Sequence, residues 1–556
     1  MKTPHKINKD VETMPYKARR DFIWLILRPW ILIPRLIYIL TSTLILIIRF
    51  LLQGSSKDKK IQKQLGVFLL NTIARLGPCF IKLGQALSTR PDLVKQEWLE
   101  ELTKLQDDLP PFNHKLALNI FKEEIGDSTE NMFEYFPNEP IASASLGQVY
   151  KARINSKCWV AVKIQRPNLN YIIRRDLVII RSICWFIGPF LPLNLGFGLD
   201  EIIDEFGTSL FNEIDYEKEA DNAERFGQLF KENKAIEVPR VERLISSKKV
   251  ITTSWIEGTK LKDRQTLIEQ KIDPTSIIRT AVISGLQQLL EFGYFHADPH
   301  PGNLFALNGK AGSLGKIGYV DFGMMDSISD KDRTTLTGAI VHIINKDFKL
   351  LAEDFQRLGF LSNKQDLNDI SPVLEEVLSG VIDKDVNSLN FKTVTDKFSN
   401  LMFEYPFRVP ARFALIIRAV VSQEGLALRL DPQFKILRFA YPYVAKRLLT
   451  EENEELVEIL MDIVFDDMNS IRVERLEGLL EVISETSNNP GRELLPVATN
   501  GLKLLLSNKG SKIRKKLLLS LIKNDEFNLG DMLGLLKLIS RKFSPLNLSQ
   551  NNNGNV

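Results

Sequence analysis

Hydrophobic and polar positions follow the spacing of α-helices along most of this chain, with two exceptions. Short runs of β-branched and aromatic residues lie at about 133–167 and near 236–257. In the first of them, two strand-type segments, 148–152 and 159–164, are separated by Asn155-Ser156-Lys157, which predicts a hairpin. After residue 258 the pattern is helical to about residue 540. The pattern therefore predicts an α+β protein whose strands end by about residue 257.

The most apolar part of the chain runs from Phe22 to Leu52, and its longest uncharged stretch is the thirteen residues 36–48. A helix that spans a bilayer needs about twenty apolar residues. Two prolines near the start, Pro29 and Pro34, predict a break or a kink. Three arginines recur at multiples of seven residues, so on a helix they stay close to one face: Arg28, Arg35 and Arg49. We expect a helix on a membrane surface, or a kinked one whose arginines extend to the head groups; a helix packed on the protein's own core is the alternative.

Composition and charge narrow the class of protein. The 556 residues are 44% hydrophobic and 26% charged, which is typical of a globular protein with two to four domains. The net charge of +4 is too small for a nucleic-acid binder, so no nucleic-acid partner is expected. Residues 1–60 nevertheless carry a net charge of +8, which suits an anionic lipid surface. Three well-separated cysteines cannot form a disulfide framework and indicate a reducing compartment.

The residues with the clearest chemistry lie in His296-Ala297-Asp298-Pro299-His300-Pro301-Gly302-Asn303, followed by Asp321-Phe322-Gly323. The five-residue step from Asp298 to Asn303 is that of the protein-kinase catalytic loop, and a later Asp-Phe-Gly stands where kinases hold magnesium. Asp298 is the candidate base that orients and deprotonates the attacking hydroxyl or water. Asn303 and Asp321 are candidate Mg²⁺ ligands, since hard cations prefer oxygen. Either motif alone also fits an ordinary turn or loop.

A candidate nucleotide site precedes these motifs. Lys163 ends Val160-Ala161-Val162-Lys163 and stands where a kinase strand lysine contacts the α and β phosphates; a surface lysine on an edge strand is the alternative. In place of a G-x-G-x-x-G loop the chain has small residues, whose β-carbons predict a stiffer loop with altered nucleotide selectivity. The candidate nucleotide-binding residues there are Ile141, Ala142, Ser143, Ala144, Ser145, Leu146, Gly147, Gln148 and Val149. The absence of G-x-x-x-x-G-K-[ST] excludes a P-loop NTPase.

Two departures from ordinary protein kinases bear on the substrate. Ala297 replaces the arginine that precedes the catalytic aspartate in many kinases. After Gly323 the sequence turns helical from about Lys331 without an A-P-E motif, which leaves scarcely any room for an activation segment. These departures favour ATP hydrolysis, or phosphorylation of a small or lipid molecule, over phosphorylation of a docked peptide.

From about Lys57 to Ala445 the sequence resembles the UbiB, or aarF-domain, family of atypical kinases. The family's K-x-G-Q motif is similar to Lys82-Leu83-Gly84-Gln85, its E-x-D motif to Glu213-Ile214-Asp215, and its alanine-rich loop to residues 142–148. The resemblance implies a two-lobed, protein-kinase-like fold in which Lys82 and Gln85 lie over the active site and pair with the region of Glu213 and Asp215. The sequence leaves open which acid pairs with Lys163 and which with Lys82, and Glu213 is our choice for Lys163.

The expected organisation has five parts. A basic and apolar membrane-associating segment (1–56) precedes a helical extension with the K-x-G-Q motif (57–130). A kinase-like N-lobe (131–258) and C-lobe (259–450) follow. A mostly helical C-terminal extension (451–556) ends in a polar tail, Ser549 to Val556, that is expected to be disordered. The extension looks like those of cyanobacterial and plastid members.

The resemblance implies a membrane-associated kinase or ATPase that uses ATP and Mg²⁺ and supports isoprenoid quinone, of the plastoquinone or ubiquinone type, or prenyl-lipid biosynthesis and homeostasis. The implied partners are anionic membrane lipids and prenylquinone precursors or their biosynthetic enzymes. The implied location is the cytoplasmic face of a cyanobacterial membrane, with a plastid lineage open. A protein kinase that acts on membrane-associated enzymes, and a pseudokinase scaffold that only binds nucleotide, are the alternatives.

Overall fold

The computed structural model describes most of residues 16–87, 110–188, 199–382, 407–485 and 499–527, with positions 98, 101, 102 and 537. The tail 549–556 and the first fifteen residues lie outside the described part. The chain forms two compact units. The first holds Met1–Lys260, Gly302–Asn308 and Lys316–Met325, and the second holds Leu261–Pro301, Gly309–Gly315 and Asp326–Val556.

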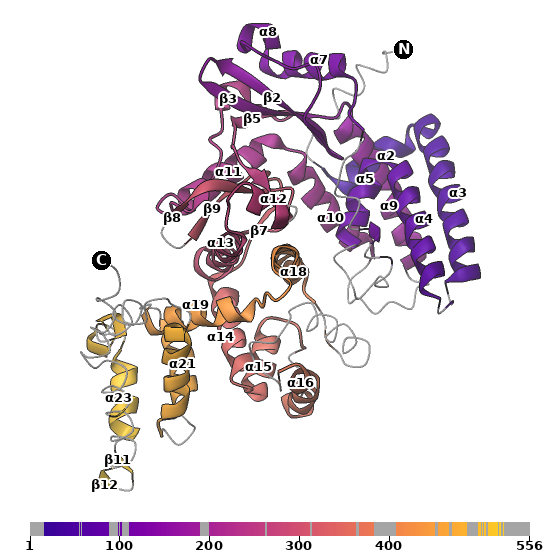
Figure 1. Ribbon diagram of the computed structural model, residues 1–556. Coiled ribbons are helices and arrows are strands. Elements are labelled where there is room, and N and C mark those ends of the chain that lie inside the picture. The colour runs from indigo at the N-terminus through magenta and orange to yellow at the C-terminus, as the bar shows by residue number, and fades with distance from the viewer. Residues whose placement is uncertain are drawn as a thin grey trace. The chain divides into compact units, whose positions relative to one another are not determined.

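A four-stranded antiparallel sheet, in the order β1-β2-β3-β5, forms part of the first unit (Figure 1). Its strands are β1 (Ala142–Ser143), β2 (Gly147–Asn155), β3 (Cys158–Gln165) and β5 (Val250–Ser254). Strands β2 and β3 form the hairpin predicted from the sequence, with Asn155 opposite Cys158. Alternate residues such as Tyr150, Val160 and Val162 are fully buried, and α7 (His114–Ile125) packs on that face through Phe121.

A second sheet contradicts the expectation that strands end near residue 257. It has the order β4-β9-β8-β6, from β4 (Ile236–Glu237), β6 (Thr259–Lys260), β8 (Leu304–Ala311) and β9 (Leu314–Tyr319). Strand β4 pairs with β9 in parallel, although about eighty residues separate them. Strand β4 lies within the strand-type region near 236–257, whereas β6, β8 and β9 lie beyond it. A short apolar run such as residues 304–307 cannot be told from a buried helical segment by periodicity alone, so pairing with distant strands decides its structure.

Six helices of the first unit form a bundle (Figure 1). They are α2 (Ala18–Ile26), α3 (Pro29–Gln53), α4 (Lys59–Leu76), α5 (Pro78–Leu87), α9 (Leu169–Ile187) and α10 (Leu199–Glu213). The shared core includes Leu25, Ile39 and Leu177. The break predicted near Pro29 is confirmed, because α2 ends before it and α3 begins at it; Pro34 lies inside α3.

Helix α3 has two different faces. On one, Arg35 pairs with the buried carboxylate of Asp176 on α9 at 2.6 Å, and its side chain is 15% exposed. The guanidinium of Arg49 lies 4.3 Å from the ring of Phe68 on α4. The expectation that Arg35 extends to lipid head groups is therefore wrong, because the apolar bundle holds it in an ion pair. The other face is open, and only 6% of the helix's most apolar window is buried.

The second unit is mostly helical. Its central helix α13 (Pro274–Leu286) continues as the π-helix η4 (Gln287–Phe292) and leads into β7 (Tyr294–His296). Helix α13 packs against α18 (Ala411–Leu430) and α19 (Leu437–Thr450). The remaining longer helices are α14 (Asp330–Ile344), α15 (Phe348–Arg357), α16 (Leu367–Ile382), α20 (Glu454–Val464), α21 (Val473–Glu485) and α23 (Ser511–Ser520). Helices α20, α21 and α23 share a core of their own around Val457, Met461 and Ile513.

Candidate active site

The centre of the candidate site is one lysine held by two carboxylates. The Nζ atom of Lys163, on β3, lies 2.9 Å from both carboxylate oxygens of Glu219 and 3.2 Å from Oδ2 of Asp321. Glu219 lies one turn into α11 (Tyr216–Leu229) and is 4% exposed. The predicted partner, Glu213, is wrong. Helix α11 begins only after Asp215, so the residue that faces β3 is Glu219, while Glu213 ends the preceding helix α10.

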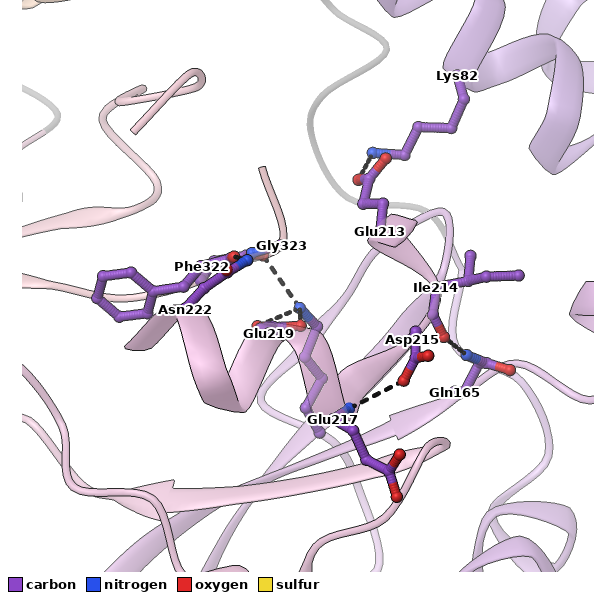
Figure 2. A network of polar contacts seen from close by, with 12 residues as sticks. Lys82, Gln165, Glu213, Ile214, Asp215, Glu217, Glu219, Asn222, Phe322 and Gly323 are labelled. Atoms are coloured by element: carbon purple, nitrogen blue, oxygen red, sulfur yellow. Dashed lines mark hydrogen bonds and ion pairs between the residues drawn. The ribbon is translucent and has the colours of Figure 1, made fainter. Parts of the chain in front are cut away.

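Glu213 instead pairs with Lys82 of α5 (Figure 2), as the K-x-G-Q resemblance implies for the E-x-D region. Both side chains are less than 15% exposed. A β-carbon placed on Gly323 would lie 3.5 Å from Cγ of Glu213 and 3.8 Å from Oε2 of Glu219. The two lysine–glutamate pairs therefore flank the same turn of backbone. Asp215 caps α11 by accepting a hydrogen bond from the backbone of Glu217, and Gln85 is buried.

The Asp-Phe-Gly turn is held in one conformation from three directions. Asp321 has a positive φ of 62°, a region that residues other than glycine adopt rarely and mostly at constrained sites. Its Oδ1 accepts a hydrogen bond from the backbone of Gly323 at 3.2 Å. Phe322 is buried against Phe226 of α11, and Nδ2 of Asn222 donates to the carbonyl oxygen of Phe322 at 2.9 Å (Figure 2). These contacts direct the Asp321 carboxylate toward Lys163.

The alanine-rich loop connects β1 to β2 and is closed by backbone hydrogen bonds, Ile141 to Val149 and Ala144 to Gly147, both of 2.8 Å. Arg166 donates to the carbonyl oxygen of Ala144 and to Oγ of Ser143. The rest of the predicted nucleotide-binding set differs in exposure: Ile141 is 52% exposed, whereas Ser145, Leu146, Gly147 and Gln148 are buried.

Two residues of this set have structural roles. A β-carbon on Gly147 would lie 2.5 Å from the hydroxyl of Tyr216, so this position requires glycine. The Gln148 side chain is fully buried and bonds the hydroxyl of Tyr150 and the backbone of Phe112. The Gln148 amide thus satisfies polar groups in the interior of the sheet, and a contact between Gln148 and nucleotide stays a prediction.

The charges of the network follow from burial and from mutual attraction. Burial disfavours the ammonium form of Lys163, but the carboxylates of Asp321 and Glu219 outweigh it and raise the pKa of Lys163 well above its usual value. Burial raises the pKa of Glu219 to about 7, although Lys163 opposes this shift. Asp321 is the most accessible member, with its side chain 44% exposed. An anionic ligand would therefore meet a permanent cation, and a cation would meet an accessible carboxylate.

The residues present fit a magnesium ion of the kind that nucleotide phosphates share. Asp321 offers a carboxylate and Asn303 an amide oxygen, and the backbone joins them because Val320 donates to the Asn303 carbonyl oxygen at 3.0 Å. Among the described residues no cluster of three or more His, Cys, Asp or Glu forms a self-sufficient metal site. Two oxygen donors suit Mg²⁺, which keeps part of its coordination for water and phosphate.

Asp298 lies in the second unit, just after β7, and its backbone is positioned through a chain of hydrogen bonds. Oε1 of Gln288, in η4, accepts from the backbone of His296 at 2.9 Å, and Nδ1 of His296 accepts from the backbone of Asp298 at 3.1 Å. The carboxylate of Asp298 faces Arg418 of α18 at 3.0 Å. The sequence interpretation had missed Arg418, because no motif marks it, and Glu219, whose only signal was helical register from Asp215.

Comparison with known proteins identifies the family of this chain. The model of the ABC1 atypical kinase-like domain matches residues 104–355. An uncharacterized protein of Synechocystis is 46% identical over 89% of this chain and 86% of its own length. The chloroplastic protein ACTIVITY OF BC1 COMPLEX KINASE 1 of Arabidopsis thaliana is 39% identical over 85% of this chain and 70% of its own.

Among solved structures, the complex of Rv3197 with erythromycin from Mycobacterium tuberculosis is 25% identical, with a TM-score of 0.44 over 63% of this chain and 87% of that one. The chain belongs to the family of ABC1, or aarF-domain, atypical kinases, and its relatives are cyanobacterial and chloroplastic. Its α+β fold is kinase-like, as the sequence predicted.

Proposed function

We propose that this protein binds Mg-ATP and transfers its γ-phosphoryl group to water or to a small or lipid acceptor. The observation that carries the proposal is the Lys163 ammonium held between a buried Glu219 and an accessible Asp321. In protein kinases a strand lysine bound to a helix glutamate contacts the α and β phosphates, and the Asp-Phe-Gly aspartate holds Mg²⁺. The same three roles are assigned here to residues that the fold already brings together.

The chemistry assigned to each residue follows from charge. Lys163 offsets negative charge on the α and β phosphates, and bound Mg²⁺, held by Asp321 and Asn303, would neutralise charge on the β and γ phosphates. Asp298 orients the attacking hydroxyl or water and accepts its proton. A bond forms between the attacking oxygen and the γ phosphorus, the bond from that phosphorus to the bridging oxygen breaks, and ADP leaves.

The acceptor class and the cellular role belong to the same proposal. Lys82 and Glu213 lie beside Gly323, where a peptide-docking segment would begin in an ordinary kinase. This favours a small or lipid acceptor. The family resemblance, with cyanobacterial and chloroplastic relatives, favours a role in isoprenoid quinone or prenyl-lipid biosynthesis at the cytoplasmic face of a membrane. Prenylquinone precursors or their biosynthetic enzymes are the partners proposed.

The open face of α3 is the proposed membrane contact. Pro29–Gln53 is the single candidate span among the described residues, and length and composition alone are weak evidence of crossing. The opposite face is tied to α4 and α9 through Arg35 and Arg49, which favours a helix lying in the membrane surface. Its exposed apolar side chains are Trp30, Ile33, Ile37, Tyr38, Leu40, Leu44, Ile45, Ile47, Ile48, Leu51 and Leu52.

A flotation assay tests the membrane contact. We expect Ile37→Glu/Leu44→Glu/Leu51→Glu to release the protein from vesicles that contain anionic lipid, because these side chains are 56%, 56% and 78% exposed. Leu244→Glu is the control, since Leu244 is 95% exposed and lies outside the bundle. Retained flotation of the triple variant would place the contact elsewhere. Point substitutions are preferable to deleting the segment, because Leu25 and Ile39 belong to the bundle core.

Release of ADP from Mg-ATP tests the phosphoryl-transfer proposal. The purified chain is assayed with and without anionic vesicles and a quinone-precursor mimic, with Asp298→Asn as the blank. We expect release that the blank lacks and that lipid stimulates. Equal release by the wild type and the blank would contradict the role of Asp298. Bound nucleotide without release under any condition would contradict the transfer reaction and indicate a nucleotide-binding scaffold.

A further inference from the structure

A buried arginine faces the candidate base from a distant part of the chain. Nη2 of Arg418 lies 3.0 Å from Oδ2 of Asp298, and the two side chains are 7% and 15% exposed. Arg418 is 120 residues beyond Asp298 and lies outside the segment 104–355 that the family model matches. A charged group that is this well buried needs a counter-charge, and for Arg418 the ion pair that the structure provides is with Asp298.

Packing of α18 on α13 brings Arg418 to this place. A β-carbon on Gly285 of α13 would clash with the side-chain amide of Gln423, so the two helices approach closely at that point. Gln423 is five residues after Arg418 on α18. Helix α13 runs directly into η4, whose Gln288 begins the hydrogen-bond chain through His296 to Asp298. The contact between α13 and α18 thus joins the helix that leads to Asp298 with the helix that carries Arg418. π-Helical turns are frequent at functional sites.

We propose that Arg418 is a positioning residue for the general base Asp298. It supplies, from α18, a positive charge beside the base in a chain where Ala297 occupies the usual arginine position. The inference rests on the proposed function, because it concerns the base of that reaction. Charge attraction holds the Asp298 carboxylate in one direction, and a correctly oriented base is worth roughly 10²- to 10⁴-fold in rate.

The quality of the contact supports an active role over a purely structural one. The ion pair is close, yet Nη2 of Arg418 makes no aligned hydrogen bond among the described residues. Buried hydrogen-bond donors in native proteins nearly always have an acceptor, so a buried guanidinium nitrogen without an aligned hydrogen bond calls for an explanation. Catalytic hydrogen bonds are often poorly aligned without substrate and tighten when it binds. We therefore expect the ion pair between Arg418 and Asp298 to become an aligned hydrogen bond when nucleotide and acceptor bind.

Steady-state ADP release with Mg-ATP tests the inference, with anionic vesicles present. For Arg418→Met we expect kcat to fall by about 100-fold while KM for ATP stays within about twofold, because the base loses orientation and the Lys163 network is untouched. Arg418→Lys keeps the charge and should retain kcat within about tenfold of the wild type. Arg412→Met is the matched control: it removes from the same helix an arginine that pairs with Asp332 at 3.2 Å, and it should keep wild-type turnover.

The double variant Asp298→Asn/Arg418→Met separates positioning from stability. If Arg418 acts through Asp298, the double variant turns over no more slowly than Asp298→Asn alone. Its melting temperature exceeds that of Arg418→Met, because the double variant has no buried carboxylate that has lost its arginine counter-charge. If Arg418→Met does not fold, the comparison is Arg418→Lys against Arg412→Lys, with a measurable fall in kcat expected for the first alone.

Wild-type kcat in Arg418→Met, or equal losses in the Arg418 and Arg412 variants, would overturn the inference while leaving the proposed function intact. Wild-type protein that releases no ADP, or releases as much as Asp298→Asn does, would overturn the proposed function itself and the role of Arg418 with it. The two failures are therefore distinguishable within one set of assays.

Discussion

The two catalytic-type carboxylates of this protein are held in opposite ways. Asp321, in the first unit, is 44% exposed and shares the Lys163 ammonium with a buried glutamate. Asp298, in the second unit, is 15% exposed and faces an arginine that is itself almost fully buried. The accessible carboxylate suits a ligand role, because a metal ion must reach it, whereas the enclosed carboxylate suits a base whose direction matters more than its access. The difference between the two environments therefore fits the two chemical roles proposed for these carboxylates.

Neutralising each carboxylate in turn tests whether Asp298 and Asp321 have different roles. We expect Asp298→Asn and Asp321→Asn each to lower kcat by about 10²- to 10⁴-fold, because one removes the base and the other a metal ligand. Only Asp321→Asn should also weaken Mg²⁺-dependent nucleotide binding. Isothermal titration with ADP at varied Mg²⁺ measures this difference. Equal Mg²⁺ dependence in both variants would remove the distinction between ligand and base.

Removing the cation that organises Asp321 should have the next largest effect. Lys163→Met loses charge-assisted hydrogen bonds to phosphate that are worth roughly 1.5–3 kcal/mol, so the Kd for ATP should rise by about 10- to 100-fold. Lys151→Met is a control from the neighbouring strand β2, because that lysine contacts the rings of Trp159 and Trp255. An unchanged Kd in Lys163→Met would contradict the assignment of the nucleotide phosphates to this network.

The Lys163–Glu219 pair predicts a pH dependence with two opposite signs. Burial raises the pKa of Glu219 to about 7, so below pH 7 this carboxyl takes up a proton and its ion pair with Lys163 is lost. ATP affinity should therefore fall several-fold between pH 8 and pH 6, and Glu219→Gln should lack this acid limb.

The stability of the fold depends on the protonation of Glu219 in the opposite sense to ATP affinity. A folded-state pKa raised above the ordinary value of 4.5 means that the stability contributed by protonated Glu219 is complete below pH 4.5 and is lost as pH rises through 7. The melting temperature of the wild type, relative to Glu219→Gln, should decline over that window. A constant difference between the two melting curves would contradict the raised pKa.

The smallest effect that we predict concerns the alanine-rich loop. Arg166 is half-buried and donates to the carbonyl oxygen of Ala144 and to Oγ of Ser143. Arg166→Met removes these bonds, each worth about 1 kcal/mol, and should weaken ATP binding by about fivefold without changing kcat. Arg153→Met is the control. Arg153 lies near the far end of β2, and its guanidinium faces Glu134. A changed kcat with unchanged Kd would contradict a role confined to the loop.

Sequence reasoning was most accurate where the pattern is local. The hairpin whose second strand carries Lys163 and the helix break at Pro29 need only a few neighbouring residues to be recognised. It was wrong for Glu213 because α10 ends at that residue and α11 starts after the Asp215 cap. The carboxylate that reaches Lys163 is therefore Glu219, six residues further along the chain. It was wrong for Arg35 because helical spacing placed this arginine on a face but could not show that Asp176 lies opposite.

The sequence by itself determined which residues are candidates for the chemistry, since the Asp298-to-Asn303 spacing, the Asp-Phe-Gly motif and the strand of Lys163 are recognised by residue type at short range. Tertiary structure alone decided which opposite charges meet. Lys82 with Glu213, Lys163 with Glu219, and Asp298 with Arg418 are separated by 131, 56 and 120 residues. Such pairs depend on where helices begin and on how closely they pack, as at Gly285 and Gln423, and these are properties of the assembled fold.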